Sequence, residues 1–596
     1  MTGALRGRLG LPSSDSARPA GREHGHTPDL QATAPAPPRH GRIDDIEVLR
    51  AVAVIFVMIH HAHGSLITWP VRGFDWFSTH FILGSGVNIF FGVSGFVIAR
   101  SILRTLAETR SHRAYANMTL GFWTRRAWRL LPSAWLWLVL VQVAAVTFNA
   151  SNAFMSPHAN DGAWEAGILN VANFRFAERF GSQEYGASFP YWSLSLEEQF
   201  YFLFPILIFI FRNYLKYVAA VLIAIQWMLP PLFYPLLMHS IRTDGLLFGV
   251  LVAIWVDHRS YSAADKILSR MKAVMPFIVL ALLAGLGAVA AGDFEISILY
   301  PAPVTIFCTL LVVIASFNRG YVLPGGAVKR VILWAGSRSY ALYLIHIPAF
   351  CAAREIWFRI MPAGTVFAGT YTLRYVLTAV LLVVVLSELN YRLVEHPLRS
   401  YGVKVADRIQ RHGIALPKVR APLLASAAVW LAMLGMAEAG RIGLLGRIFA
   451  APIAPGTDLA ETATFARLAG DGWSAHEPWG IWSIGDRAGI NVPIARNAAG
   501  QWTLAVDGSV LLGEKHPQAT VAFRANGIEI GRYTAVTGKD RIDERMAIPA
   551  GAFAADPGYL RIDILVDRPI SPYALGISLD RRSLGFALRS MKLLKE

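Results

Sequence analysis

The chain has 596 residues, but few of them are charged and only two are cysteines, and each scarcity excludes a class of protein. Charged residues make up 16% of the sequence, against about 25% in an ordinary soluble domain. Cys308 and Cys351 both lie inside apolar runs, which favours two small core residues over a disulfide or a metal site. No apolar core precedes a small-residue cleavage site near the N-terminus, so a cleaved signal peptide is not expected.

Long apolar segments account for most of the sequence instead, since 54% of the residues are hydrophobic. Segments of this length and hydrophobicity are typical of membrane helices. Residues 1–42 are rich in Gly, Pro, Ala, Ser and Arg and predict a disordered cytoplasmic tail. Eleven apolar segments follow, near 46–66, 80–99, 131–149, 192–211, 217–236, 243–256, 274–291, 299–317, 333–353, 375–391 and 421–439.

The charges of the connecting loops predict the orientation in the membrane. If the N-terminus is cytoplasmic, the inner segments carry 29 Lys and Arg and the outer loops carry 7. Cytoplasmic loops are enriched in these residues, so this orientation is strongly favoured. The same bias explains the net charge of +16 without a nucleic-acid partner. Eleven crossings then place the C-terminal region outside the cytoplasmic membrane.

The C-terminal region, 455–596, has a different character. Stretches such as 520–534 and 559–567 alternate apolar and polar residues between Gly, Pro, Asp and Asn, which is typical of antiparallel strands. We therefore predict an extracytoplasmic all-β sandwich. Four tryptophans cluster in its first third, and they either stack on sugars or, as we favour, belong to the core: Trp473, Trp479, Trp482 and Trp502.

Arg50 and His61 belong to the first apolar segment and are eleven residues apart. Eleven residues complete three helical turns, so the two side chains point the same way and are separated by about 16 Å along the axis. Titratable residues are costly inside a membrane helix and mark functional sites. The spacing predicts a fixed cation near one membrane surface and an acid–base group deeper in the bilayer.

Two layers of polar residues follow from the predicted helix directions. Five segments bring polar groups to the outer half of the membrane, where we expect a site built from His61, Asn88, Glu197, Arg242, Asp244 and His346. Arg125, Arg126 and Arg129 lie at the inner surface, level with Arg50. Arginines bind phosphates through paired hydrogen bonds, although ordinary positive-inside anchoring also explains this triplet.

Several of these stretches together resemble the acyltransferase-3 family of integral membrane O-acyltransferases over residues 43–402. The resemblance is carried, in the expected order, by the Arg50–His61 spacing, GVNIFFGVSGFVI (86–98), RRAWRLLP (125–132), YWSLSLEEQFYFLFP (191–205), SYALYLIHIP (339–348) and YRLVEHPLR (391–399). The chain departs from the family pattern at Glu47 and Val48, and Asn88 stands where an Asp is common. Some relatives end in an esterase-like domain, but this chain has no convincing Gly-Asp-Ser block.

The resemblance implies a fold and a domain order. We expect an α-helical polytopic membrane protein, with a bundle of about ten helices and an eleventh linking helix, followed by the β-sandwich. The expected domains are a tail (1–42), a membrane acyltransferase domain (43–402), a basic linker with the eleventh helix (403–454) and the β-domain (455–596). The expected location is a bacterial-type cytoplasmic membrane, with the lipid bilayer as a partner.

The resemblance also implies the reaction, which is transfer of an acyl group, most often acetyl, from cytoplasmic acyl-CoA to a hydroxyl of a cell-surface or lipid-linked glycan. Arg50, Arg125, Arg126 and Arg129 would hold the CoA phosphates, with no permanently bound cofactor and no metal. His61 would act as general base, assisted by Glu197, or would carry the acyl group covalently. Asn88, Arg242, Asp244 and His346 would line the acceptor site.

A secondary transporter and a polyprenyl-sugar glycosyltransferase are the alternative functional classes. A secondary transporter should show internal repeats with broken helices in matching positions, and no obvious repeat occurs. A polyprenyl-sugar glycosyltransferase would carry acidic residues in its first outer loop, and residues 67–79 contain only Asp75.

Overall fold

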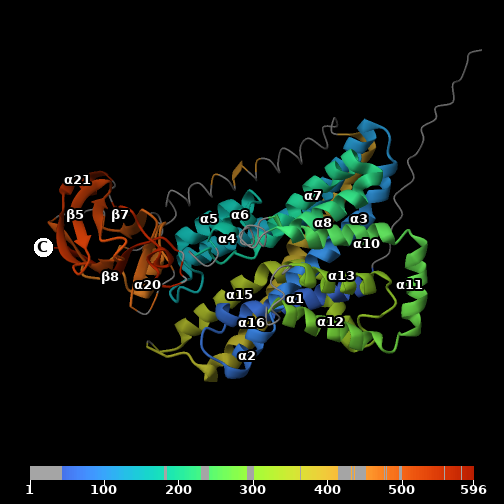
Figure 1. Ribbon diagram of the computed structural model, residues 1–596, viewed down its shortest axis with the longest axis horizontal. Helices are drawn as coiled ribbons and strands as arrows, with labels where there is room; N and C mark the ends of the chain where they lie inside the picture. Colours follow the sequence, from blue (N-terminus) through green and yellow to red (C-terminus); the bar gives the residue numbers. More distant parts are fainter. Residues whose placement is uncertain are drawn as a thin grey trace, which may run out of the picture. The chain divides into compact units, whose positions relative to one another are not determined.

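The computed structural model describes most of the chain from Ile43 onwards. The described residues are 43–595 without 180–183, 230–240, 292–300, 363, most of 414–451, 475–476, 478, 496–499, 556–557, 579 and 581. The expected tail (1–42) and the eleventh apolar segment (421–439) therefore lie outside them, apart from a few isolated residues of that segment. The predicted order, helices first and strands afterwards, is confirmed (Figure 1).

Between residues 44 and 412, the regular elements that the structure describes are all helices. The helices are α1 (Asp44–Ser65), α2 (Arg72–His80), α3 (Gly86–Glu108), α4 (His112–Thr147), α5 (Pro157–Ile168), α6 (Ala172–Arg179), α7 (Tyr191–Phe211), α8 (Leu215–Met228), α10 (Asp244–Trp255), α11 (Arg259–Arg270), α12 (Met275–Ala290), α13 (Pro301–Ser316), α14 (Ala327–Ser337), α15 (Ser339–Ile360), α16 (Thr372–Asn390) and α17 (His396–His412). The first ten predicted apolar segments all coincide with helices of this series.

Several of these helices have the dimensions of membrane spans. Within the described residues, five helices, some of them merged from consecutive elements, are long and apolar enough to cross a membrane, and a sixth qualifies if α11 and α12, which meet at 106°, are taken as one span. Helices 244–255 and 302–316 are apolar but shorter. Eleven crossings remain a prediction, whereas a bundle of apolar helices is observed.

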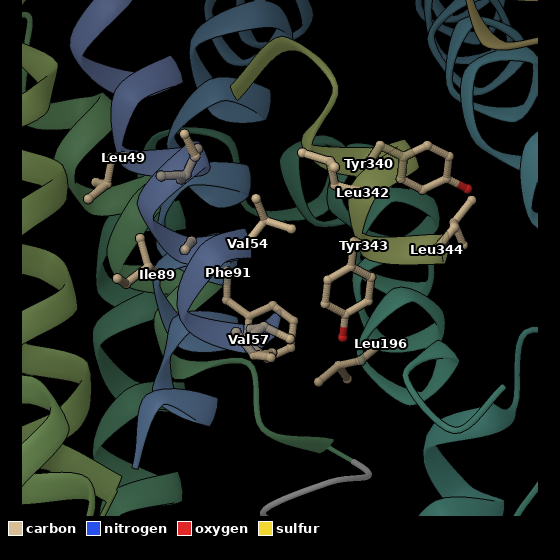
Figure 2. Packing of buried hydrophobic residues seen from close by; sticks show 14 of the residues in the cluster. Leu49, Val54, Val57, Ile89, Phe91, Leu196, Tyr340, Leu342, Tyr343 and Leu344 are labelled. Carbon is tan, nitrogen blue, oxygen red and sulfur yellow. The ribbon is translucent and has the colours of Figure 1, made fainter. Parts of the chain in front are cut away.

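Helix α1 lies at the centre of the helical domain. Acidic residues in its first turn favour the helix N-terminus, and Gly64 ends the regular helix with a φ of 84°. Its Leu49, Val54 and Val57 are completely buried. Figure 2 shows them beside α3, while Tyr343 of α15 extends toward Leu196 of α7. The core thus joins helices that are far apart in sequence.

Glycines bring α3 and α10 into direct backbone contact. A Cβ atom on Gly95 would overlap the carbonyl group of Leu246, and one on Gly249 would overlap the carbonyl oxygen of Gly92. Close approach through small residues is a common way to pack membrane helices, because lipid provides no hydrophobic drive between them. This contact gives a structural reason for the glycines of GVNIFFGVSGFVI.

Residues 481–595 form the predicted β-sandwich. The strands are β1 (Ile481–Ile484), β2 (Arg487–Pro493), β3 (Trp502–Val510), β4 (Gln518–Ala525), β5 (Ile528–Val536), β6 (Arg541–Ile548), β7 (Tyr559–Val566) and β8 (Leu584–Lys595). They make two four-stranded antiparallel sheets, ordered β1-β8-β3-β6 and β2-β7-β4-β5. Alternate residues of β3 are buried, as expected for a strand with one face on a core.

The four clustered tryptophans divide into two groups. Trp473 and Trp502 are 5% and 6% exposed and belong to the sandwich core, as favoured. Trp479 is 40% exposed, and its indole donates a hydrogen bond to Glu477. Trp482 is half-buried and meets the Trp479 ring edge-on. The core interpretation therefore applies to Trp473 and Trp502, and the surface pair remains available for stacking.

The α3–α10 contact predicts that Gly95→Ala destabilises the helical domain. One added methyl group must displace backbone, and overpacking of this kind costs about 1–3 kcal/mol. We expect a lower midpoint of thermal unfolding in detergent, followed by size-exclusion chromatography. Gly73→Ala is the matched control, since no heavy atom lies within 4 Å of its added Cβ. Equal midpoints for the two variants would contradict the close contact.

Candidate active site

A pair of histidines joins α1 to α15. The Nδ1 atom of His61 lies 2.8 Å from Nε2 of His346, and the two rings are nearly coplanar, with an interplanar angle of 6°. His346 is completely buried, and Phe189 meets the His61 ring edge-on. The sequence placed both histidines in one layer, and the structure brings them into direct contact.

A pocket, here called the chamber, lies between α1, α3, α4, α7 and α15. Its lining includes Arg50, Phe90, Phe91, Ser94, Arg126, Arg129, Ser193, Glu197, Glu198, Tyr201, Ser339, Tyr340 and Tyr343. Neither histidine belongs to this lining, but Tyr343 does, and its ring centroid lies 5.6 Å from that of His346. The chamber therefore borders the histidine pair through Tyr343.

Three arginines give the chamber a positively charged region. Arg50 is held by Glu47 at 3.3 Å, and the Arg126 guanidinium lies 5.1 Å from the centre of the Tyr201 ring. Arg129 is close enough to both for their positive charges to repel its own. Its Nε atom has no hydrogen-bond partner among the described residues. Fixed guanidinium groups with spare donors suit an anionic ligand such as a phosphate.

Arg125 does not belong to this group. Its guanidinium faces α17, where the Gln410 side-chain oxygen accepts from both terminal nitrogens at 3.0 and 3.1 Å once the amide is oriented to face it. We expected Arg125 and Arg129 to share the binding face, but Arg126 and Arg129 line the chamber. Successive helical residues differ by about 100°, so neighbouring arginines of α4 serve different surfaces.

Glu197 also has different neighbours from those expected. Its carboxylate accepts hydrogen bonds from the hydroxyls of Ser94 and Tyr201, and it interacts electrostatically with Arg126. The expected support of the His61 ring by Glu197 is therefore not observed, because this carboxylate is engaged by α3 and by its own helix. Ser94 and Tyr201 were not predicted as site residues, although both lie inside the quoted motifs.

A buried acid beside the arginines was likewise missed. Glu395 is 3% exposed and ends a π-helical turn, Tyr391–Glu395, between α16 and α17. It interacts electrostatically with Arg129, Arg50 and Arg399, and its Oε2 atom has no hydrogen-bond partner among the described residues. π-turns are rare and are common at functional sites. The only available signal was its position inside YRLVEHPLR.

Arg242 and Asp244 form a separate buried cluster that does not line the chamber. They pair at 3.1 Å, and Asp244 also accepts hydrogen bonds from Trp227 and Thr305. Asn88 lies near this cluster. Its backbone oxygen would be 3.6 Å from a Cβ atom added to Gly245, the residue that follows Asp244. The structure thus separates Asn88, Arg242 and Asp244 from the chamber, contrary to the single layer that we expected.

Among the residues that the structure describes, no group of three or more His, Cys, Asp or Glu side chains is placed to hold a metal ion. Cys308 and Cys351 are buried free thiols.

Comparison with known proteins supports an acyltransferase. A protein-family model described as an acyltransferase domain matches residues 43–388. YrhL of Bacillus subtilis strain 168, named as a candidate peptidoglycan O-acetyltransferase, is 25% identical over 397 residues, or 62% of this chain and 57% of its own. Peptidoglycan O-acetyltransferase OatA of Listeria monocytogenes strain EGD-e is 25% identical over 398 residues, or 60% and 56%. The chain thus spans less than two thirds of these relatives, and no solved structure matches it.

The buried ion pair predicts a strong effect on stability. Asp244→Asn should lower the free energy of unfolding by about 3–5 kcal/mol, because it leaves the Arg242 charge without its partner. The double variant Arg242→Met with Asp244→Leu should recover only part of this loss, because the unpaired charge is removed but Trp227 and Thr305 lose their acceptor. Thermal unfolding in detergent measures both. A single variant as stable as the wild type would show that the pair is not needed for stability.

Proposed function

The chain belongs to the acyltransferase-3 family, and from this premise we propose that it transfers an acetyl group from acetyl-CoA to a hydroxyl of a cell-surface glycan. The observation that carries the proposal is the chamber itself. It has three arginines in its lining and borders a buried histidine pair through Tyr343. A long donor with a charged head and a reactive end needs both features in one cavity.

The arginine region suits the head of the donor. CoA carries phosphate groups, and its pantetheine arm is narrow and flexible. Arg50, Arg126 and Arg129 would bind the phosphates, and the unpartnered Nε of Arg129 is a free donor for one of them. Glu395 would keep these arginines in place while the site is empty. The arm would then run along the chamber toward Tyr343.

The histidine end suits the chemistry. His61 would take the proton of the acceptor hydroxyl while the oxygen attacks the thioester carbonyl. Collapse of the tetrahedral intermediate breaks the carbon–sulfur bond. His61 then gives its proton to the departing CoA thiolate. The products are the ester and free CoA, so the reaction needs no other reactant. Ser193 and Tyr343, whose oxygens are 2.7 Å apart, form the polar part of the chamber wall nearest to the histidine pair.

The names of the relatives support a glycan as the acceptor. OatA is named for peptidoglycan O-acetylation, and YrhL is named for the same polymer. The loop charges favour an orientation in which the arginine region would face the cytoplasm, where acetyl-CoA is made, and the β-domain would lie on the opposite side of the membrane, with the glycan. A multi-pass membrane protein with this orientation would pass an acetyl group, rather than a whole donor, across the bilayer.

Replacement of His61 tests the assignment of the base. His61→Ala should lower kcat by about 10²–10⁴-fold, because a positioned general base is lost. The assay is transfer of radiolabelled acetyl from acetyl-CoA to a soluble glycan fragment by purified enzyme. His60→Ala is the matched control, since its ring packs against Gly84 instead of His346. Wild-type turnover in His61→Ala would contradict the proposed function.

The arginines give a second, independent test. Arg126→Gln and Arg129→Gln should each weaken acetyl-CoA binding by roughly 10–100-fold, which corresponds to one lost hydrogen bond between charged groups. Arg125→Gln should bind nearly as the wild type does, because Arg125 faces α17. Calorimetric titration of the three purified variants with CoA measures the difference. A larger loss in Arg125→Gln than in the other two would place the donor elsewhere.

A further inference from the structure

We propose that His346 is a positioning residue that holds His61 in the one tautomer able to act as a base through its outer nitrogen, Nε2. This inference rests on the proposed function. It gives a role in the reaction to a residue that is not part of the chamber lining. Three hydrogen bonds in series, from a backbone carbonyl through both rings, carry the argument. Each of them restricts where the next proton can lie.

The series begins at the backbone of α15. Nδ1 of His346 lies 2.7 Å from the carbonyl oxygen of Tyr343, one helical turn earlier. A carbonyl oxygen can only accept, so the hydrogen must be on Nδ1 of His346. Tyr343 is itself held in place, because its hydroxyl bonds to Ser193 and donates to the Pro190 carbonyl at 3.2 Å.

The second step concerns the charge of His346. This ring is completely buried, and no carboxylate is among its hydrogen-bond or ion-pair partners in the described part of the chain. An isolated charge in such a place is strongly unfavourable, so His346 is neutral. A neutral imidazole with hydrogen on Nδ1 has a bare Nε2, which can only accept.

The tautomer of His61 follows. Its Nδ1 lies 2.8 Å from the bare Nε2 of His346 and must therefore donate to it. The Nε2 atom of His61 is then left without a hydrogen and is free to take a proton. Nearly coplanar rings, at 6°, align the donor with the lone pair, and Phe189 packs edge-on against the His61 ring. The ring orientation is thus fixed from two sides.

This arrangement differs from a histidine supported by a carboxylate. The usual partner of a basic histidine is an acid, which holds the tautomer and also stabilises the imidazolium that forms. Here the supporting group is neutral, which fits a buried site inside an apolar bundle, since the resting pair needs no counter-charge. The free-energy cost of a buried charge then arises only while His61 carries the proton taken from the acceptor hydroxyl.

Two polar substitutions of His346 separate positioning from packing. The amide oxygen of His346→Gln can reach the place of Nε2 and accept from His61, whereas the shorter His346→Asn can bond only near its own backbone. We expect kcat of the Asn variant to fall by about 100-fold, as for other losses of a tautomer-fixing partner. The Gln variant should stay within about 10-fold of the wild type, and KM for acetyl-CoA should change little in both, because the phosphates bind elsewhere.

A double variant makes the test specific. Because His346 acts through His61, adding His346→Asn to His61→Ala should lower the residual rate by less than about 2-fold. Turnover in the Asn variant equal to the wild type, or equal losses in Asn and Gln variants that both elute as folded protein, would overturn the positioning role. If the Asn variant does not fold, the Gln variant decides, and its kcat must stay within about 10-fold of the wild type. Activity in His61→Ala alone would instead overturn the proposed base, so the two failures are distinguishable.

Discussion

The polar groups that this bundle buries must find partners inside the protein, because an apolar surrounding offers none. Some buried carboxylates meet this requirement through backbone N–H groups of distant segments. The carboxylate of Glu355 accepts from the backbone of residues 150 and 151, and Asp45 accepts from the backbone of residues 320 and 321. Buried polar atoms without a hydrogen bond occur in several parts of the described chain, and Arg129 in the chamber lining has one of them, its Nε. A bound phosphate would supply an acceptor for this nitrogen.

The same constraint explains the architecture around the site. Helices that carry charge must be held firmly, and glycines at the α3–α10 contact let two backbones touch. Helix α3 then presents Ser94 to Glu197 on its other side, and α7 presents Tyr201 to the same carboxylate. The position of the acid therefore depends on packing between elements that the sequence separates by about a hundred residues. The neutral histidine pair solves the corresponding problem between α1 and α15 without any carboxylate.

Apolar segments predicted the helices, and alternation of apolar and polar residues predicted the β-sandwich, because both depend on local patterns. Contacts between distant segments were beyond this reasoning. The Arg50–His61 spacing showed that both side chains share a face, but nothing local shows that His346 lies against His61, 285 residues later. Three arginines lie close together on α4, and the sequence does not show which of them face the chamber. The contact of Arg125 with Gln410 of α17 shows that Arg125 faces another surface. Glu197 was expected to support His61, whereas its hydrogen-bond partners come from α3 and from one turn along α7.

The central claim is that one donor molecule spans the chamber from the arginines to the histidine pair. A cryo-electron microscopy structure of the full chain with a non-hydrolysable acetyl-CoA analogue tests it most directly. The account predicts density for the phosphates against Arg126 and Arg129, with the acyl end beside Tyr343 and within reach of His61. Phosphate density at any other place, or an acyl end directed away from His61, would contradict it.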